Sequence, residues 1–237
     1  MKKIGILSAM WVEAELLAEA MQNVRVSEYS GMKYYEGMLG GCAAVLSTCG
    51  VGKINAAIYT QQMIDRFSVD ALLHTGIAGS LDPRVRHLDV VAADRLTYHD
   101  VRRSQMRDLF PYQLFFETDP RLCRLLGQGA EKYGKEREEE TQVHTGLILT
   151  GDAFVTDQRE KERLKQSFPQ ALCVEMEGCA VAHTAYANQV PIGVIRCISD
   201  LADGSAQEDY GAFEKKAADK AAKIVMQALL KMKEIEI

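Results

Sequence analysis

The sequence lacks the cysteine and histidine patterns that hold metal ions or build disulfide frameworks. None of its six cysteines stands in CxxC spacing, and most lie in apolar segments, where a reduced thiol behaves as a small core residue. His99-Asp100 is a tempting metal pair, but no second histidine accompanies it at ligand spacing, so a solvated loop is the better interpretation. We therefore expect a protein of the reducing cytoplasm that holds no metal.

Excess basic charge and long apolar runs are also missing. The chain has 28 basic and 33 acidic residues, a net charge of -5, which argues against general nucleic-acid binding and polybasic membrane contact. No run of about eighteen apolar residues and no charged-then-apolar leader is present, so we expect neither a membrane span nor secretion by a signal peptide. Small-molecule chemistry fits this composition better.

Strand-like and helix-like segments alternate through most of the chain. With 237 residues, 47% of them hydrophobic, we expect one packed domain spanning residues 1–237. Residues 98–117 are the least regular and suit a lid or an interface, whereas 131–142 form a charge run typical of a solvated helix end. The pattern predicts an α/β fold with a central mixed, mostly parallel sheet flanked by helices. Apolar runs predict strands at 3–8, 33–39, 42–47, 70–74, 89–93, 144–149, 172–174 and 192–195, and helical spacing predicts helices near 9–21, 55–67, 178–187 and 213–232.

The stretch 172–203 is the centre of the candidate site. Two strands joined by a helix read there as one βαβ unit, with Glu175 and Glu177 after the first strand and Asp200 after the second. The two strands of such a unit are parallel, and open α/β folds bind ligands where parallel strands end. We therefore expect these three carboxylates to converge.

Two glycine-rich segments follow other predicted strands. Residues 48–53 enter a helix and suit an anion, although the Walker A pattern is broken at Ser47 and Ile54. Residues 75–80 form either a plain tight turn or a place where backbone N–H groups approach a ligand closely.

Carboxylates predominate at the predicted strand ends. Without a histidine cluster they suit a divalent metal, sugar hydroxyls, or acid/base work around an oxocarbenium-like transition state. Phe154 and Met176 among them favour a flat, partly apolar ligand with a polyol attached, as in a nucleoside. Acidic residues after strands also cap helices, and this interpretation stays open for Glu175 and Asp203.

The chain resembles the nucleoside phosphorylase/hydrolase superfamily over nearly its whole length, and most closely the 5′-methylthioadenosine/S-adenosylhomocysteine nucleosidases. The order and spacing of several segments together make the resemblance specific. They are Ile4-Gly5-Ile6 with Ala9-Met10 and Glu13, Gly50-Val51-Gly52-Lys53 with Asn55-Ala56-Ala57, Thr75-Gly76-Ile77-Ala78-Gly79, Tyr98-His99-Asp100, Gly151-Asp152-Ala153-Phe154, Val174-Glu175-Met176-Glu177 and Arg196-Cys197-Ile198-Ser199-Asp200.

The resemblance implies cofactor-free hydrolysis of the N-glycosidic bond of 5′-substituted adenosines by a homodimer, within methionine salvage. The substrates would be methylthioadenosine, S-adenosylhomocysteine and, by extension, 5′-deoxyadenosine. Asp200 would be the general acid at N7 of adenine, and Glu13 would activate the attacking water. The resemblance assigns substrate binding to Met10, Ile77, Ala78, Gly79, Phe154, Val155, Glu175, Met176, Glu177, Arg196, Ser199 and Tyr210.

Two departures from the family pattern bear on this expectation. Ile77 stands where related nucleosidases have a serine, and residues 101–106 replace a Val-Thr-aromatic-Gly-Tyr run that shapes the pocket for the 5′ group. The arginines of the altered loop either meet a polar 5′ substituent or face solvent. A phosphate-dependent phosphorylase is disfavoured because Glu13 and Glu15 would repel phosphate. A non-catalytic nucleoside-binding domain stays open as a third alternative.

Overall fold

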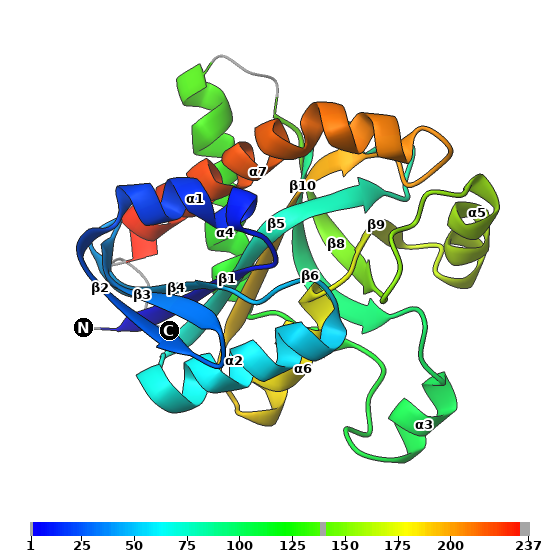
Figure 1. Ribbon diagram of the computed structural model, residues 1–237. Helices are drawn as coiled ribbons and strands as arrows, with labels where there is room; N and C mark the ends of the chain where they lie inside the picture. The colour runs from blue at the N-terminus through cyan, green and yellow to red at the C-terminus, as the bar shows by residue number, and fades with distance from the viewer. Residues whose placement is uncertain (1, 138–140, 233–237) are drawn as a thin grey trace.

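Ten strands and seven helices form within residues 2–137 and 141–232, the part of the chain that the computed structural model describes (Figure 1). The strands are β1 (Lys3–Ser8), β2 (Gln22–Tyr29), β3 (Met32–Leu39), β4 (Cys42–Thr48), β5 (Ala71–Ser80), β6 (Val90–Tyr98), β7 (Phe116–Glu117), β8 (Val143–Thr150), β9 (Ala171–Glu175) and β10 (Ile192–Asp200). The helices are α1 (Trp11–Ala20), α2 (Lys53–Phe67), α3 (Arg103–Asp108), α4 (Pro120–Arg137), α5 (Gln158–Ser167), α6 (Gly178–Ala187) and α7 (Ala206–Lys231).

All the strands belong to one mixed sheet, as the alternating pattern predicts. Parallel pairs join β4–β1–β5–β10 and β6–β8–β9, and antiparallel pairs join β2–β3, β3–β4, β10–β6, β5–β9 and β6–β7. Because β5 pairs with both β10 and β9, strands β5, β10, β6, β8 and β9 close into a ring. The remaining long strands extend from the ring as an arm.

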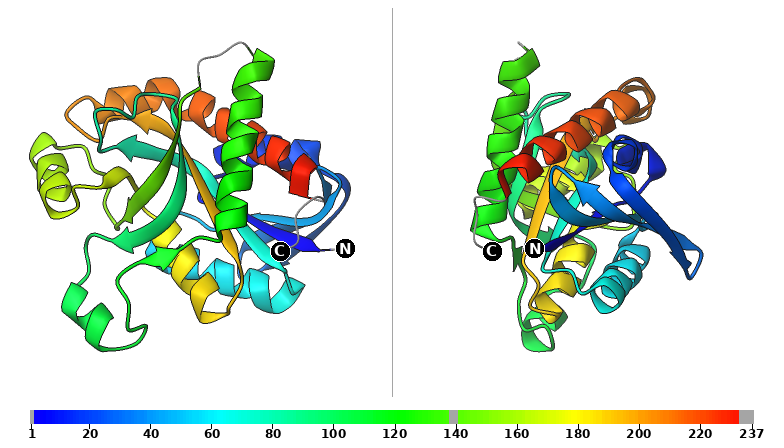
Figure 2. Two further views of the ribbon diagram at one scale, coloured as in Figure 1. Left: turned by 180° about the vertical axis from the view of Figure 1, so that it is seen from behind. Right: turned by 90° about the vertical axis from the view of Figure 1, so that its left-hand side faces the viewer.

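Helices cover the sheet on both faces, and its central strands lie between them (Figure 2). Every residue of β5 and of β10 is buried. One hydrophobic cluster joins α1, α4 and α7 to the sheet and includes Leu17 and Val225. A second cluster joins α2 and α6 to the other face and includes Met63 and Val181. None of the helices in the described ranges is long and apolar enough to span a bilayer.

The prediction of a βαβ unit was wrong about the direction of its two strands. Strand β9 runs antiparallel to β5, whereas β10 runs parallel to it, so the two strands flanking α6 do not form a parallel pair. They converge for another reason: Val174 of β9 and Asp200 of β10 are both in register with Gly79 of β5. Ring closure, rather than parallel strand ends, brings the carboxylates together.

One predicted turn is part of a strand, and one predicted strand is longer than expected. Residues 75–80 complete β5 and residues 196–200 complete β10, because the two segments continue to pair with each other. The glycines serve close packing: a Cβ on Gly76 would collide with the Glu13 carboxylate, and one on Gly79 with the Asp200 carboxylate.

Several other elements differ from the sequence-based expectation. Strand β2, helix α5 and the part of α4 before residue 131 were not predicted, and α7 begins at Ala206 rather than near residue 213. The irregular stretch 98–117 contains α3 and β7. The charge run at 131–142 includes the end of α4 at Arg137, and residues 138–140 lie outside the described ranges.

Candidate active site

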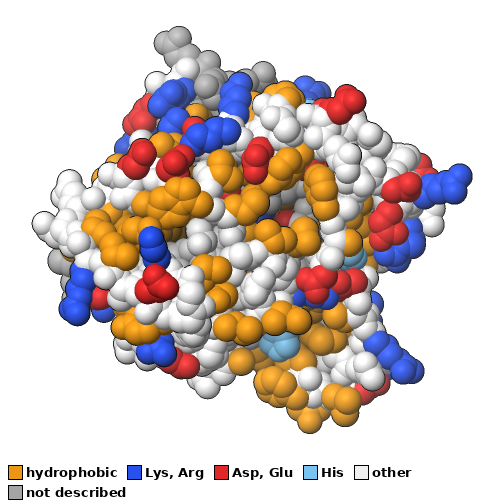
Figure 3. All heavy atoms as spheres, viewed as in Figure 1, with side chains coloured by type: hydrophobic (Ala, Val, Ile, Leu, Met, Phe, Trp, Pro, Cys, Tyr) orange, Lys and Arg blue, Asp and Glu red, His pale blue; other side chains and the backbone are white. Residues whose placement is uncertain are grey.

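A pocket of about 260 Å³ opens where β5, β9 and β10 end. Figure 3 shows it as a hollow near the middle of one face, rimmed largely by hydrophobic side chains. Three lining residues were not among the expected site residues, namely Ala9, Val51 and Val174, although each belongs to a segment that carries the family resemblance. The expected residues that line it are Met10, Glu13, Ile77, Ala78, Gly79, Phe154, Glu175, Met176, Glu177, Ser199, Asp200 and Tyr210.

The two other expected residues lie beside or behind this pocket. Val155 lines a neighbouring cavity of about 20 Å³ together with Phe154 and Asp200. Arg196 is only 1% exposed and lies behind Glu175, to which its Nη2 donates at 2.6 Å. The same nitrogen donates to Nε2 of His74, whose Nδ1 is 3.0 Å from the Leu7 carbonyl oxygen. Arg196 therefore acts on the site through the groups it positions.

Glu13 is fixed in the first turn of α1 by backbone amides. Its Oε2 accepts the N–H groups of Ala9 at 2.8 Å and Met10 at 2.9 Å, and its Oε1 accepts that of Ile77 at 3.1 Å. Burial raises the pKa of Glu13 above its ordinary value, while the Arg196 charge and the amides oppose the rise. A buried carboxylate with a raised pKa and a fixed orientation suits a general base.

Asp200 ends β10 and faces the same pocket. Its Oδ2 accepts the Ser199 hydroxyl at 2.8 Å, and its Oδ1 accepts the Ala202 N–H at 2.9 Å. Burial raises the pKa of Asp200, these hydrogen bonds oppose the rise, and the nearby Asp209 adds to it. The raised pKa favours the protonated form, which a general acid requires.

The two glutamates after β9 are in different environments. Glu175 accepts hydrogen bonds from Arg196 and Thr150, and its Oε2 also accepts the N–H groups of Glu177 at 3.0 Å and Gly178 at 2.6 Å at the start of α6. Although burial opposes ionisation, the Arg196 charge and these partners keep the pKa of Glu175 below its ordinary value. The helix-capping interpretation is therefore correct for Glu175.

Glu177 has much weaker support for its charge. Its Oε1 accepts the Gly52 N–H at 2.7 Å. Burial and the neighbouring Glu175 raise the pKa of Glu177 to about 8. The glycine-rich segment before α2 thus binds a carboxyl group of the protein itself rather than an external anion.

Aromatic and sulfur-containing side chains form the rim. The rings of Phe154 and Tyr210 meet edge to face, with centroids 5.4 Å apart. The Tyr210 hydroxyl donates to Glu214 at 2.8 Å and lies 3.6 Å from the Met10 sulfur. Because Phe154 comes from the loop after β8 and Tyr210 from the start of α7, the rim joins distant parts of the chain.

The histidine and arginines after β6 do not line the pocket. Asp100 is bound by Lys53 rather than by His99. Arg102 and Arg107 are exposed, and Arg103 lies over the ring of Phe168, 5.0 Å from its centroid. The solvent interpretation of the altered loop, residues 101–106, is thus correct for Arg102, whereas Arg103 packs on Phe168. Within residues 2–137 and 141–232, no group of three or more His, Cys, Asp or Glu side chains is arranged to hold a metal ion.

Comparison with known proteins agrees with this geometry. The family model of the phosphorylase superfamily matches residues 3–230. A 5′-methylthioadenosine/S-adenosylhomocysteine nucleosidase of Staphylococcus carnosus is 34% identical over 230 residues, which cover 95% of this chain and 98% of the relative. The Staphylococcus aureus nucleosidase of the same name is 32% identical over 219 residues, covering 91% and 93% of the two chains.

Solved structures show the same likeness. The nucleosidase of Neisseria meningitidis in complex with methylthio-immucillin-A has a TM-score of 0.90 and 32% identity, over 98% of this chain and 100% of that one. The futalosine hydrolase of Helicobacter pylori has a TM-score of 0.86 and 30% identity, over 99% and 98%. The chain therefore belongs to the phosphorylase superfamily and, within it, to the 5′-methylthioadenosine/S-adenosylhomocysteine nucleosidase family.

Proposed function

We propose that this protein hydrolyses the N-glycosidic bond of 5′-substituted adenosines, with 5′-methylthioadenosine and S-adenosylhomocysteine as substrates, and releases adenine. The names of its relatives support the substrate class. The pocket supports the chemistry, because it combines aromatic and thioether side chains for a purine with carboxylates for a sugar.

The observation that carries the proposal is the sign of the charge in the pocket. Four acidic side chains line it, Glu13, Glu175, Glu177 and Asp200, and among the described residues no lysine or arginine does. Arg196, directly behind the wall, already neutralises Glu175 at 2.6 Å. A phosphate dianion would find no cation to compensate its charge there and would lie near the Glu13 carboxylate, whereas water meets no such barrier. Water is therefore the nucleophile, and the phosphorylase alternative is disfavoured.

In this mechanism each carboxyl group has a separate role. Protonated Asp200 donates to N7 of adenine, so that the base leaves as a neutral molecule when the bond to C1′ breaks. Glu13 removes a proton from the water molecule whose oxygen attacks C1′. Positive charge that develops on the ribose is stabilised by the surrounding carboxylates. Glu177 accepts hydrogen bonds from the ribose hydroxyls, Met176 packs beneath the sugar, and Phe154 stacks on the purine beside Val155.

The test is release of adenine from each nucleoside in phosphate-free buffer. The Asp200→Asn variant is expected to lose turnover by at least about a hundredfold because it cannot donate the proton. Asp203→Asn is the matched control, since Asp203 lies outside the pocket lining and binds Ser205 at the start of α7. Turnover that required phosphate would establish the phosphorylase. Ligand-induced thermal stabilisation without adenine release would establish a binding domain.

We further propose that the protein acts as a cytoplasmic homodimer. Large apolar side chains are exposed beside the pocket, among them Ile54 at 73% and Ile58 at 47% on α2. Leu109 and Phe110 after α3 are 61% and 67% exposed. In Figure 3 hydrophobic side chains gather in the lower part of the face, over α2 and the loop that carries α3. A second copy would cover them, and sedimentation of Ile54→Glu as a monomer beside a dimeric unaltered protein is the check.

A further inference from the structure

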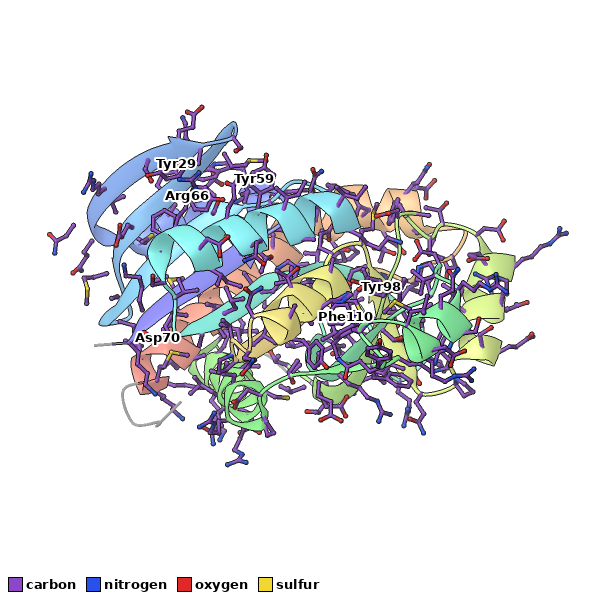
Figure 4. All side chains as sticks on the ribbon, turned by 90° about the horizontal axis from the view of Figure 1, so that it is seen from below. Tyr29, Tyr59, Arg66, Asp70, Tyr98 and Phe110 are labelled. Atoms are coloured by element: carbon purple, nitrogen blue, oxygen red, sulfur yellow. The ribbon has the colours of Figure 1, made fainter. Side chains whose placement is uncertain are left out.

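Outside the pocket lining, one ammonium group binds two carboxylates, so that three charged side chains form a cluster. They are Lys53 at the start of α2, Asp100 after β6 and Asp152 after β8. The Lys53 Nζ is 2.6 Å and 2.7 Å from the two carboxylate oxygens of Asp100, and 3.4 Å from Oδ2 of Asp152. The same ammonium group lies 5.6 Å from the ring centroid of Tyr98, which Figure 4 shows beside α6. We refer to Lys53, Asp100 and Asp152 as the clamp.

Backbone hydrogen bonds close the clamp into a cycle. Oδ2 of Asp100 accepts the N–H of Asp152 at 2.9 Å, and Oδ1 of Asp152 accepts the N–H of Lys53 at 2.8 Å. Each of the three segments is thus bound to the other two. The side-chain exposures of 19% for Lys53 and 30% for Asp100 place their ion pair in partial shelter from solvent, where it is less screened than a fully exposed pair.

The clamp ends next to the amide that binds Glu177. Gly52 donates its N–H to Glu177 at 2.7 Å, and the very next N–H, that of Lys53, is held by Asp152. Gly52 has a φ of +98°, and a Cβ on it would lie 3.3 Å from Oδ1 of Asp152. Consecutive amides therefore point at two different carboxylates, and fixing one peptide plane orients the other.

We propose that Lys53, Asp100 and Asp152 are positioning residues that hold the Gly52 amide against Glu177 and thereby keep Glu177 available as the acceptor for the ribose hydroxyls. This inference rests on the proposed function, because it concerns the ribose contact of the same site. The clamp itself touches no reacting atom. It acts through a hydrogen bond, and its loss should therefore weaken recognition of the sugar while leaving recognition of the base intact.

The charge state of Glu177 supplies a second signature. The Gly52 hydrogen bond favours the ionised carboxylate and so opposes the effect of burial and of Glu175 on the pKa of Glu177. If the clamp is broken and the amide moves away, ionisation of Glu177 requires a higher pH. The affinity for a ribose-containing ligand then rises with pH at a higher midpoint than in the unaltered protein.

The experiment measures binding of two probes by titration calorimetry between pH 6 and pH 9, in an Asp200→Asn background that suppresses turnover. 5′-Methylthioadenosine contains the ribose, and adenine lacks it. Lys53→Met is expected to weaken 5′-methylthioadenosine binding about tenfold and to raise the midpoint of its pH dependence, with adenine binding unchanged. Lys53→Arg, which keeps the charge, is expected to restore most of the affinity.

Lys3→Met is the matched control, because Lys3 forms a comparable ion pair with Glu36 at 2.8 Å on β3. Equal weakening of both probes by Lys53→Met would mean general damage and would overturn the clamp, as would unchanged affinity for both. Asp100→Asn repeats the test without altering α2. If the protein with Asp200 intact bound 5′-methylthioadenosine but released no adenine, the proposed function would fail. The comparison of the two probes by calorimetry would still test the clamp. If it bound neither probe, both proposals would fail.

Discussion

The proton on Glu177 makes the stability of this protein fall as the pH rises. In the folded protein the pKa of this carboxyl is raised from 4.5 to about 8 by burial and by Glu175. Between these two values the folded state keeps the proton while the unfolded chain releases it, so the free energy of unfolding decreases with pH across the window. The difference between 4.5 and about 8, at about 1.4 kcal/mol per pKa unit, corresponds to roughly 5 kcal/mol.

Glu177→Gln removes this dependence because an amide does not titrate. The assay is urea denaturation of both proteins at pH 5 and at pH 8. From pH 5 to pH 8 the unfolding free energy of the variant is expected to rise by several kcal/mol relative to that of the unaltered protein. Buried groups that do not interact with Glu177 titrate alike in both proteins and cancel in the difference, whereas Glu175, whose charge acts on Glu177, contributes to the measured effect. Glu28→Gln, on the exposed β2, is the control. If the difference in unfolding free energy between Glu177→Gln and the unaltered protein were the same at pH 5 and at pH 8, the raised pKa of Glu177 would be refuted.

Two further predictions follow from buried contacts. Gly76→Ala places a methyl group against the Glu13 carboxylate and should lower kcat by about a hundredfold, because Glu13 is misplaced. Gly211→Ala is the control, because no atom lies near the position of its Cβ in α7. It should leave kcat unchanged and stabilise the fold by about 0.5–1 kcal/mol. Steady-state kinetics with urea denaturation checks both, and equal kcat values would contradict the first. Arg196→Met leaves Glu175 buried without its partner and should cost about 3–5 kcal/mol of unfolding free energy, a loss that Glu175→Gln in the same chain should partly reverse.

Residue types predicted the site better than they predicted the fold around it. Carboxylates and glycines after apolar runs indicated Glu13, Glu177 and Asp200, and all three line one pocket although the strand directions differ from those expected. The direction of β9 was not predictable, since a short buried strand looks the same in either direction. The burial of Arg196 behind Glu175 also escaped, because pairing with an acid twenty-one positions earlier leaves no periodic signal.

The missed elements have similar physical causes. Residues 22–29 form β2 although most of them are exposed, so they lack the buried alternation by which a strand is recognised. Helix α4 contains three glycines and a charged end, both of which obscure its apolar face. Residues 75–80 look like a turn, but their glycines make room for the carboxylates of Glu13 and Asp200.

The shared register at Gly79 limits how this site can diversify. Asp200 and the strand leading to Glu177 are both aligned on that one residue of β5, so a shift of β5 moves Asp200 and Glu177 together. The spacing between Asp200 and Glu177 therefore does not depend on shifts of other strands. Variation of the pocket that leaves this spacing intact is available at the rim, where Val51 and Tyr210 belong to segments outside the ring of strands. A library aimed at new nucleosides should vary these two positions and leave β5 untouched.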